Sequence, residues 1–134
     1  MATTTLATTG RGVQAYQAVH VQSRSPLELV VMLFDGALRF LQQARDAQAR
    51  GDVRTRAHGV SRALAIVGEL QNTLNMDEGG ALATELERLY LYMSGRLLDV
   101  TLKRDATALD EVHKLMALLR DGWAQASEAA RAGR

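Results

Sequence analysis

The chain has 134 residues, a length that suits one domain with its own hydrophobic core. It has no cysteine, which excludes disulfides, thiolate metal sites and cysteine nucleophiles. Its 16 lysines and arginines and 15 aspartates and glutamates give a formal charge of +1, spread along the chain, so the charge balance does not favour nucleic acid or an anionic membrane as a partner.

Targeting signals and metal motifs are both missing from the sequence. The first ten residues lack the basic start and apolar run of a secretory signal, and no stretch approaches the ~18 apolar residues that span a membrane. The histidines, His20, His58 and His113, show no paired ligand spacing. We therefore expect a soluble, cytoplasmic protein without membrane insertion, metal or cofactor.

The first 24 residues lack a strong structural signal. Residues 1–12 show no periodicity, and residues 13–21, VQAYQAVHV, are weakly amphipathic but too short to form a stable helix alone. Two interpretations stay open: a frayed leader, or a segment that docks Tyr16 onto the folded domain. We expect 1–24 to be a flexible N-terminal segment and 25–131 to be the folded domain.

A strong helix start follows at Ser25. Ser25 can serve as N-cap, Pro26 suits the first helical position, and Glu28 completes a capping box. The apolar residues then recur with helical spacing as far as Gln48. This predicts a helix with an apolar arc wider than one core-facing stripe requires.

Three more helices are predicted in chain order. Gly51 ends the first helix and Asp52 caps a second, over 53–74; residues 75–80 form a turn, a third helix covers 81–103, and Asp105 caps a fourth that runs to about residue 130. Short connections between long helices predict an all-α, antiparallel up-down-up-down four-helix bundle. The expected core stripes are Leu27, Val30, Val31, Phe34, Leu38 and Leu41; Val53, Ala57, Val60, Leu64, Val67, Leu70 and Leu74; Leu82, Leu86, Leu89, Tyr90, Met93, Leu97 and Val100; and Leu109, Val112, Met116, Leu119, Trp123 and Ala126.

Two helices carry more apolar surface than one core stripe. A bundle helix keeps one side free for solvent, so a second apolar row has no partner inside the fold and is typical of a surface that receives another helix. Surface decoration or homodimerisation would also explain such rows, and both alternatives stay open. The candidate binding rows are Leu91, Gly95, Leu98 and Leu102 in the third helix, and Leu29, Leu33, Gly36 and Phe40 in the first.

Glycines inside the predicted helices need a reason, because each costs up to about 1 kcal/mol relative to alanine. Close helix packing or the approach of a ligand backbone would explain Gly36, Gly59, Gly68, Gly95 and Gly122. The acidic residues mostly take cap or solvent-facing positions, and no Glu-x-x-His pair or phosphate-binding loop occurs. We therefore expect a protein that is not an enzyme.

Several separate motifs resemble one family. The run SPLELVVMLFDGA at 25–37 is preceded by Ala15-Tyr16 and followed by DEGG at 77–80, LYLYM at 89–93 and Trp123. In order and spacing these motifs resemble the flagellin-specific export chaperones (FliS) over about residues 13–126. The chain departs from the family pattern at Phe34, where tyrosine is common, and at Ala81, where an acidic residue often follows the double glycine.

The resemblance implies a cytoplasmic four-helix-bundle chaperone that holds the disordered C-terminal segment of flagellin. It would prevent premature polymerisation and deliver the cargo to the flagellar secretion apparatus through an export-gate membrane protein. The two apolar rows would then bind cargo, and Tyr16 with Val19 would cap the groove. An anti-sigma factor or regulatory co-chaperone is a compatible further partner, and the free protein would be a monomer or weak dimer. The competing hypothesis is a homo-oligomeric structural bundle.

Overall fold

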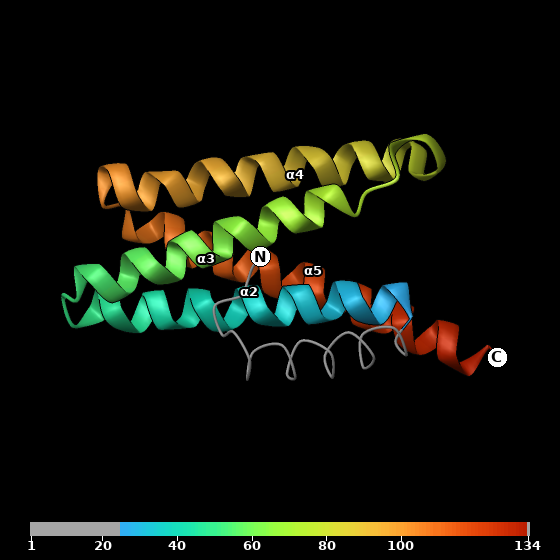
Figure 1. Cartoon of the computed structure of the whole chain (residues 1–134), viewed down its shortest axis with the longest axis horizontal. Helices are drawn as coiled ribbons and strands as arrows, with labels where there is room; N and C mark the ends of the chain where they lie inside the picture. The colour runs from blue at the N-terminus through green and yellow to red at the C-terminus, as the bar shows by residue number, and fades with distance from the viewer. Residues whose placement is uncertain (1–24, 134) are drawn as a thin grey trace, which may run out of the picture.

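The computed structural model describes residues 25–133, which form four helices: α2 (Pro26–Ala49), α3 (Val53–Asn72), α4 (Met76–Lys103) and α5 (Ala106–Ala132). Consecutive helices run in opposite directions (Figure 1), and α2 and α4 each pack against both α3 and α5. This arrangement confirms the predicted all-α bundle of the up-down-up-down type. The predictions for residues 1–24, including the stretch 13–21, lie outside the described residues.

Side chains at the helix starts satisfy the first backbone N–H groups. The Glu28 N–H donates to Ser25 Oγ at 3.1 Å, and the Ser25 N–H donates to Glu28 Oε1 at 3.1 Å, which completes the predicted capping box. Asp52 and Asp105 cap α3 and α5, as predicted. Asn75 caps α4 in the same way. Such caps hold each helix start at one residue because they replace hydrogen bonds that the helix itself cannot make.

The prediction of a turn over residues 75–80 is wrong in part. Because Asn75 accepts the Glu78 N–H at 3.0 Å, a helical turn already begins at Met76. The change of direction is concentrated at Gly80, whose φ of 55° and ψ of −133° lie outside the helical region. A residue with a side chain adopts this conformation only with strain, which explains the glycine.

The core lies along the bundle axis and contains most of the residues predicted for it. For four residues the prediction of a core position is wrong. Val53 and Leu82 are 58% and 64% exposed, and Ala57 and Ala126 are also exposed. Val53 is the first residue of α3 and Leu82 follows the Gly80 bend, so neighbouring helices do not cover them. The largest fully buried side chains are Phe34, Leu41, Val60, Val67, Leu70, Tyr90, Met93, Leu97, Val100, Leu109, Val112 and Met116.

The interior glycines divide into two groups. A Cβ added at Gly59 would lie 2.6 Å from the Phe40 carbonyl oxygen, so α2 and α3 approach each other too closely there for any side chain. A Cβ at Gly36 would meet Ile66 Cδ1 at 3.4 Å, which is an ordinary packing contact. Around Gly68, Gly95 and Gly122 there is open space. Close packing therefore requires glycine at Gly59, whereas an alanine at Gly36 would fit against Ile66.

Replacement of Gly59 by alanine should destabilise the protein by about 1–3 kcal/mol, because the added methyl group forces α2 and α3 apart. Gly68→Ala, in the same helix but in open space, should instead stabilise by about 0.5–1 kcal/mol through helix propensity. Urea denaturation followed by circular dichroism measures both changes. Equal effects of the two substitutions would contradict the close approach at Gly59.

Candidate functional site

The apolar row on α4 lies on the outside of the bundle. Leu91, Leu98 and Leu102 are 55%, 48% and 76% exposed, and Gly95 between them is exposed with open space around its Cα. The core face of the same helix, with Tyr90 and Met93, points the other way. We call Leu91, Gly95, Leu98 and Leu102 the α4 row. It is a continuous apolar strip that no other described residue covers.

The apolar row on α2 is placed differently. Gly36 is buried against Ile66 of α3, and Leu33 packs against the core cluster. The Phe40 ring meets the His58 ring edge-on, with centroids 6.1 Å apart, and Leu29 is half-buried. This row therefore lies along the contact between α2 and α3, and the structure does not join it to the α4 row.

A second apolar surface is hollowed between α4 and α5. This cavity of about 300 Å³ is lined almost wholly by apolar groups, and two of its leucines, Leu82 and Leu118, are 64% and 61% exposed. The surrounding surface can therefore accept an apolar side chain from outside. Its lining residues are Leu82, Leu86, Leu118, Leu119, Gly122, Trp123 and Ala126.

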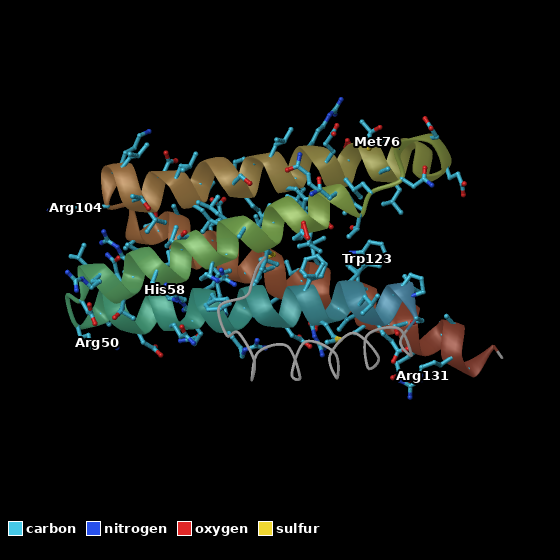
Figure 2. The ribbon with its side chains drawn as sticks, in the orientation of Figure 1. Arg50, His58, Met76, Arg104, Trp123 and Arg131 are labelled. Carbon is cyan, nitrogen blue, oxygen red and sulfur yellow. The ribbon has the colours of Figure 1, made fainter. Side chains whose placement is uncertain are left out.

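A neighbouring cavity continues this surface around the end of the bundle. It has a volume of about 240 Å³, reaches Pro26 and Leu27 at the start of α2, and shares Leu82, Leu86 and Trp123 with the first cavity. We call the two cavities together the end groove. Figure 2 shows Trp123 at the end of the bundle where α2 begins and the chain crosses from α3 to α4.

Trp123 is the wall common to both halves of the end groove. Its indole is also near enough to the hydroxyl of Tyr90 on α4 to oppose, in part, the effect of burial on the pKa of that phenol. Burial raises the pKa of Tyr90 to about 12, so this phenol stays neutral at physiological pH. Tyr90 is thus a neutral, buried group on the core side of α4.

The sequence does not predict the end groove. Leu82, Leu119 and Trp123 fall on the expected core stripes, and Leu118 has no expected role. The available signal is the apolar pattern beside the core stripe of α5, formed by Leu115, Leu118, Leu119 and Gly122. Whether such residues become core or groove depends on how far α4 covers them.

A larger cavity, between α2 and α5, has a different chemistry. It measures about 400 Å³ and is lined by charged side chains, including the Arg120–Asp35 ion pair with an Nε–Oδ1 distance of 2.8 Å. Filling this cavity with apolar groups would leave these charges poorly solvated. It is therefore a poor site for an apolar ligand.

A network of charges joins α4 to α5 near the connection between these two helices, away from the end groove. Arg96 Nε donates to Glu111 Oε1 at 2.7 Å, its Nη1 donates to Asp99 and Asp105, and Tyr92 donates to Glu111 Oε2 at 2.8 Å. The hydrogen bond from Arg96, followed by that from Tyr92, lowers the pKa of Glu111 below its ordinary value of 4.5. The network thus stabilises the folded protein through charged Glu111.

No metal site or membrane helix occurs in the described part of the chain. Among residues 25–133, no group of three or more histidine or acidic side chains is arranged to hold a metal ion. None of the four helices combines the length and the apolar character needed to cross a membrane. What the described surface offers is apolar contact area on α4 and in the end groove.

Comparison with known proteins decides the family. The model of the family described as flagellar protein FliS matches residues 9–130. The chain belongs to the FliS family. A flagellar secretion chaperone FliS of Salmonella typhimurium is 40% identical over 124 residues, which cover 89% of this chain and 92% of that protein. FliSB of Pseudomonas aeruginosa is 33% identical (84% and 93% covered), and FliS of Bacillus subtilis is 33% identical (90% and 89% covered).

These FliS relatives carry the name flagellar secretion chaperone, which supports an export chaperone role for this chain and agrees with a protein that is not an enzyme. The motifs at 25–37, 77–80 and 89–93 and Trp123 all lie within the matched range. The family prediction made from those motifs is thereby confirmed.

The charge network predicts a pH dependence of stability. The folded pKa of Glu111 lies below its unfolded value, so its contribution is present above pH 4.5 and is lost as the pH falls through the folded value. Arg96→Gln should therefore lower the urea midpoint most at about pH 7 and progressively less towards about pH 3. Arg88→Gln, which breaks an exposed pair with Glu85, is the control and should change little at any pH. If Arg96→Gln lowers the urea midpoint by the same amount at every pH, this explanation of the charge network is contradicted.

Proposed function

We propose that this protein is a cytoplasmic export chaperone that binds the disordered C-terminal segment of flagellin. By covering the apolar face of that segment it prevents premature polymerisation, and it delivers the cargo to the flagellar secretion apparatus through the export-gate membrane protein. The observation that supports this proposal most directly is the exposed apolar row on α4 in a chain of the FliS family. An anti-sigma factor or regulatory co-chaperone remains compatible with this role.

The α4 row suits an amphipathic helix as ligand. Leu91, Leu98 and Leu102 recur at helical spacing, and the exposed Gly95 lets a second backbone come close. Burial of one leucine is worth roughly 1.5–3 kcal/mol, and ordering a disordered segment offsets much of the sum. The balance favours a cargo complex that forms and dissociates without nucleotide.

The end groove extends the proposed cargo surface. Leu82 and Leu118 lie at its mouth and Trp123 forms its wall, so apolar side chains of the cargo can enter between α4 and α5. The α4 row and the end groove lie on different sides of α4. A disordered segment can cover both because it is free to change direction between them. The α2 row contributes less, because Gly36 and much of Phe40 already contact α3.

Residues 13–21 are the proposed cap of this surface, with Tyr16 and Val19 as the contacting residues. They lie outside the described part of the chain. Support for the proposal comes from Pro26 and Leu27, which follow them in sequence and line the end groove. Five residues of extended chain reach about 17 Å, enough to return residue 21 to the groove from Pro26. The cap and the cargo would then compete for the same apolar groups.

Charging the α4 row should remove cargo binding without unfolding the bundle. In Leu98→Glu with Leu102→Glu, two exposed leucines become carboxylates, so the core is untouched while the cargo must desolvate two charges. We expect the dissociation constant for a flagellin C-terminal peptide, measured by calorimetry, to rise roughly tenfold or more. Burial of two leucines contributes more binding free energy than a tenfold change in affinity requires.

The matched control introduces the same charges at the same spacing on α5. Gln125→Glu with Ala129→Glu is also exposed and lines neither half of the end groove. This variant should bind cargo as the unmodified protein does, and both variants should keep its thermal melting. If the leucine variant changes only the mass measured by light scattering and leaves cargo affinity intact, the α4 row is a self-association surface.

Deletion of residues 1–21 should leave the bundle folded and expose the end groove. Trp123 is the only tryptophan and lines both halves of the groove, so its fluorescence reports what covers it. We expect its emission to shift to longer wavelength on deletion and to return when a tryptophan-free cargo peptide is added, because water reaches the ring only while the groove is open. An unchanged emission would remove the cap from the proposal, and loss of helical signal would make the segment structural.

A further inference from the structure

The pairing of charges on this protein is uneven. Six arginines of the described chain form an ion pair with a carboxylate: Arg45, Arg50, Arg88, Arg96, Arg120 and Arg131. Four exposed arginines form none within residues 25–133; Arg39, Arg54 and Arg62 lie on α2 or α3, and Arg104 is the C-cap of α4. Helix α3 has a single acidic residue, Glu69, near its far end. The exposed arginines without an ion pair are therefore concentrated on α2 and α3.

One of these arginines and a histidine contact the same aromatic ring. Arg62 Cζ lies 5.6 Å from the centroid of the Phe40 ring, and His58 contacts the same ring edge-on. Arg39 immediately precedes Phe40 on α2. Its Nη2 lies near the Gly36–Ile66 contact between α2 and α3. We call Arg39, Phe40, Arg54, His58 and Arg62 the basic seam. Figure 2 shows His58 beside the line along which α3 and α2 meet.

We propose that the basic seam docks an acidic helical segment of a partner protein other than the cargo. Arg54, His58 and Arg62 recur every four residues, so their Cα atoms are about 6 Å apart along α3. Carboxylates one turn apart on a partner helix have the same spacing, and guanidinium groups bind carboxylates through paired hydrogen bonds. Phe40 at the centre provides apolar contact between the charged groups.

The dimensions and charge distribution favour an acidic protein segment over nucleic acid or membrane. The row from Arg54 to Arg62 spans only about 12 Å, a short site for an extended polyphosphate. The formal charge of the whole chain is +1, so the rest of the surface does not continue the positive field that nucleic acid or an anionic membrane needs.

Apart from Phe40, which also belongs to the α2 row, the basic seam is separate from the α4 row and from the end groove. Contacts of Arg62 and His58 with Phe40 place it on the side of α3 that faces α2, whereas α4 packs against another side of α3 and the end groove lies between α4 and α5. One chaperone molecule can therefore hold cargo and an acidic partner at once.

The test uses the isotope-labelled full chain and a helical, alanine-rich peptide whose glutamates are one turn apart. In a nuclear magnetic resonance titration, we expect amide shifts confined to residues around Phe40, Arg54, His58 and Arg62. The same peptide with glutamine in place of glutamate should produce none. Arg54→Glu with Arg62→Glu should weaken binding of the acidic peptide by about tenfold or more, since close charge pairs carry most of the affinity.

The control variant makes the same change of net charge elsewhere, through Arg88→Glu and Lys114→Glu, and should bind the acidic peptide within about twofold of the unmodified chain. Equal weakening by both variants, or tighter binding of a single-stranded oligonucleotide or of phosphatidylglycerol vesicles than of the peptide, would overturn the proposal. The Arg54/Arg62 variant should also keep its affinity for the flagellin peptide. Loss of that affinity would merge the seam with the cargo site, whereas failure of the α4 row to bind cargo would leave this test unaffected.

Discussion

Each helix of the bundle packs against only two others, and this limit decides which apolar side chains water still reaches. On α4, Tyr90 and Met93 face the axis and are buried, while Leu98 and Leu102 stand on the opposite side with no helix to cover them. Burial stabilises the inner row as soon as the chain folds. The outer row stays exposed to water unless another molecule covers it. This exposed apolar surface is a direct consequence of the four-helix arrangement.

The contacts between helices differ in how tightly they close. Between α2 and α3, Gly59 brings the backbones together and leaves no room for a methyl group. Between α4 and α5, Gly122 lines a hollow and the bulky Trp123 stands at its edge. The protein thus combines a closed half with an open half. Tight packing between α2 and α3 keeps the bundle in shape. The apolar residues between α4 and α5 therefore need not all be packed into a core.

Charge is distributed as unevenly as packing. Ion pairs of Arg96 and Arg120 hold α5 against α4 and α2. The carboxylates of those helices are largely engaged in the same contacts. Helix α3 takes almost no part in these pairs, which leaves Arg54 without an ion pair and Arg62 stacked on Phe40. The α4 row and the end groove therefore lie on other parts of the molecule than Arg54 and Arg62. This separation gives physical support to distinct sites for cargo and for an acidic partner.

The fold could be predicted from the sequence because its signals are local. Ser25 with Glu28, Asp52 and Asp105 set where helices begin, and the helical spacing of apolar residues set which side of each faces inward. The motif likeness to the FliS family and the second row on α4, ending at Leu102, also needed no coordinates. Family membership adds the export chaperone role, since that follows from motif and sequence similarity rather than from geometry.

Tertiary structure alone decided the rest, because periodicity gives the face of a helix but not the distance to its neighbour. It separated Gly59, where α2 touches α3, from Gly68, where a side chain would fit. It turned Leu82 and Trp123 from expected core residues into groove lining, since the helices leave cavities between them at that end of the bundle. It also placed Phe40 against α3. These outcomes depend on how helices distant in sequence approach each other, which no single helix encodes.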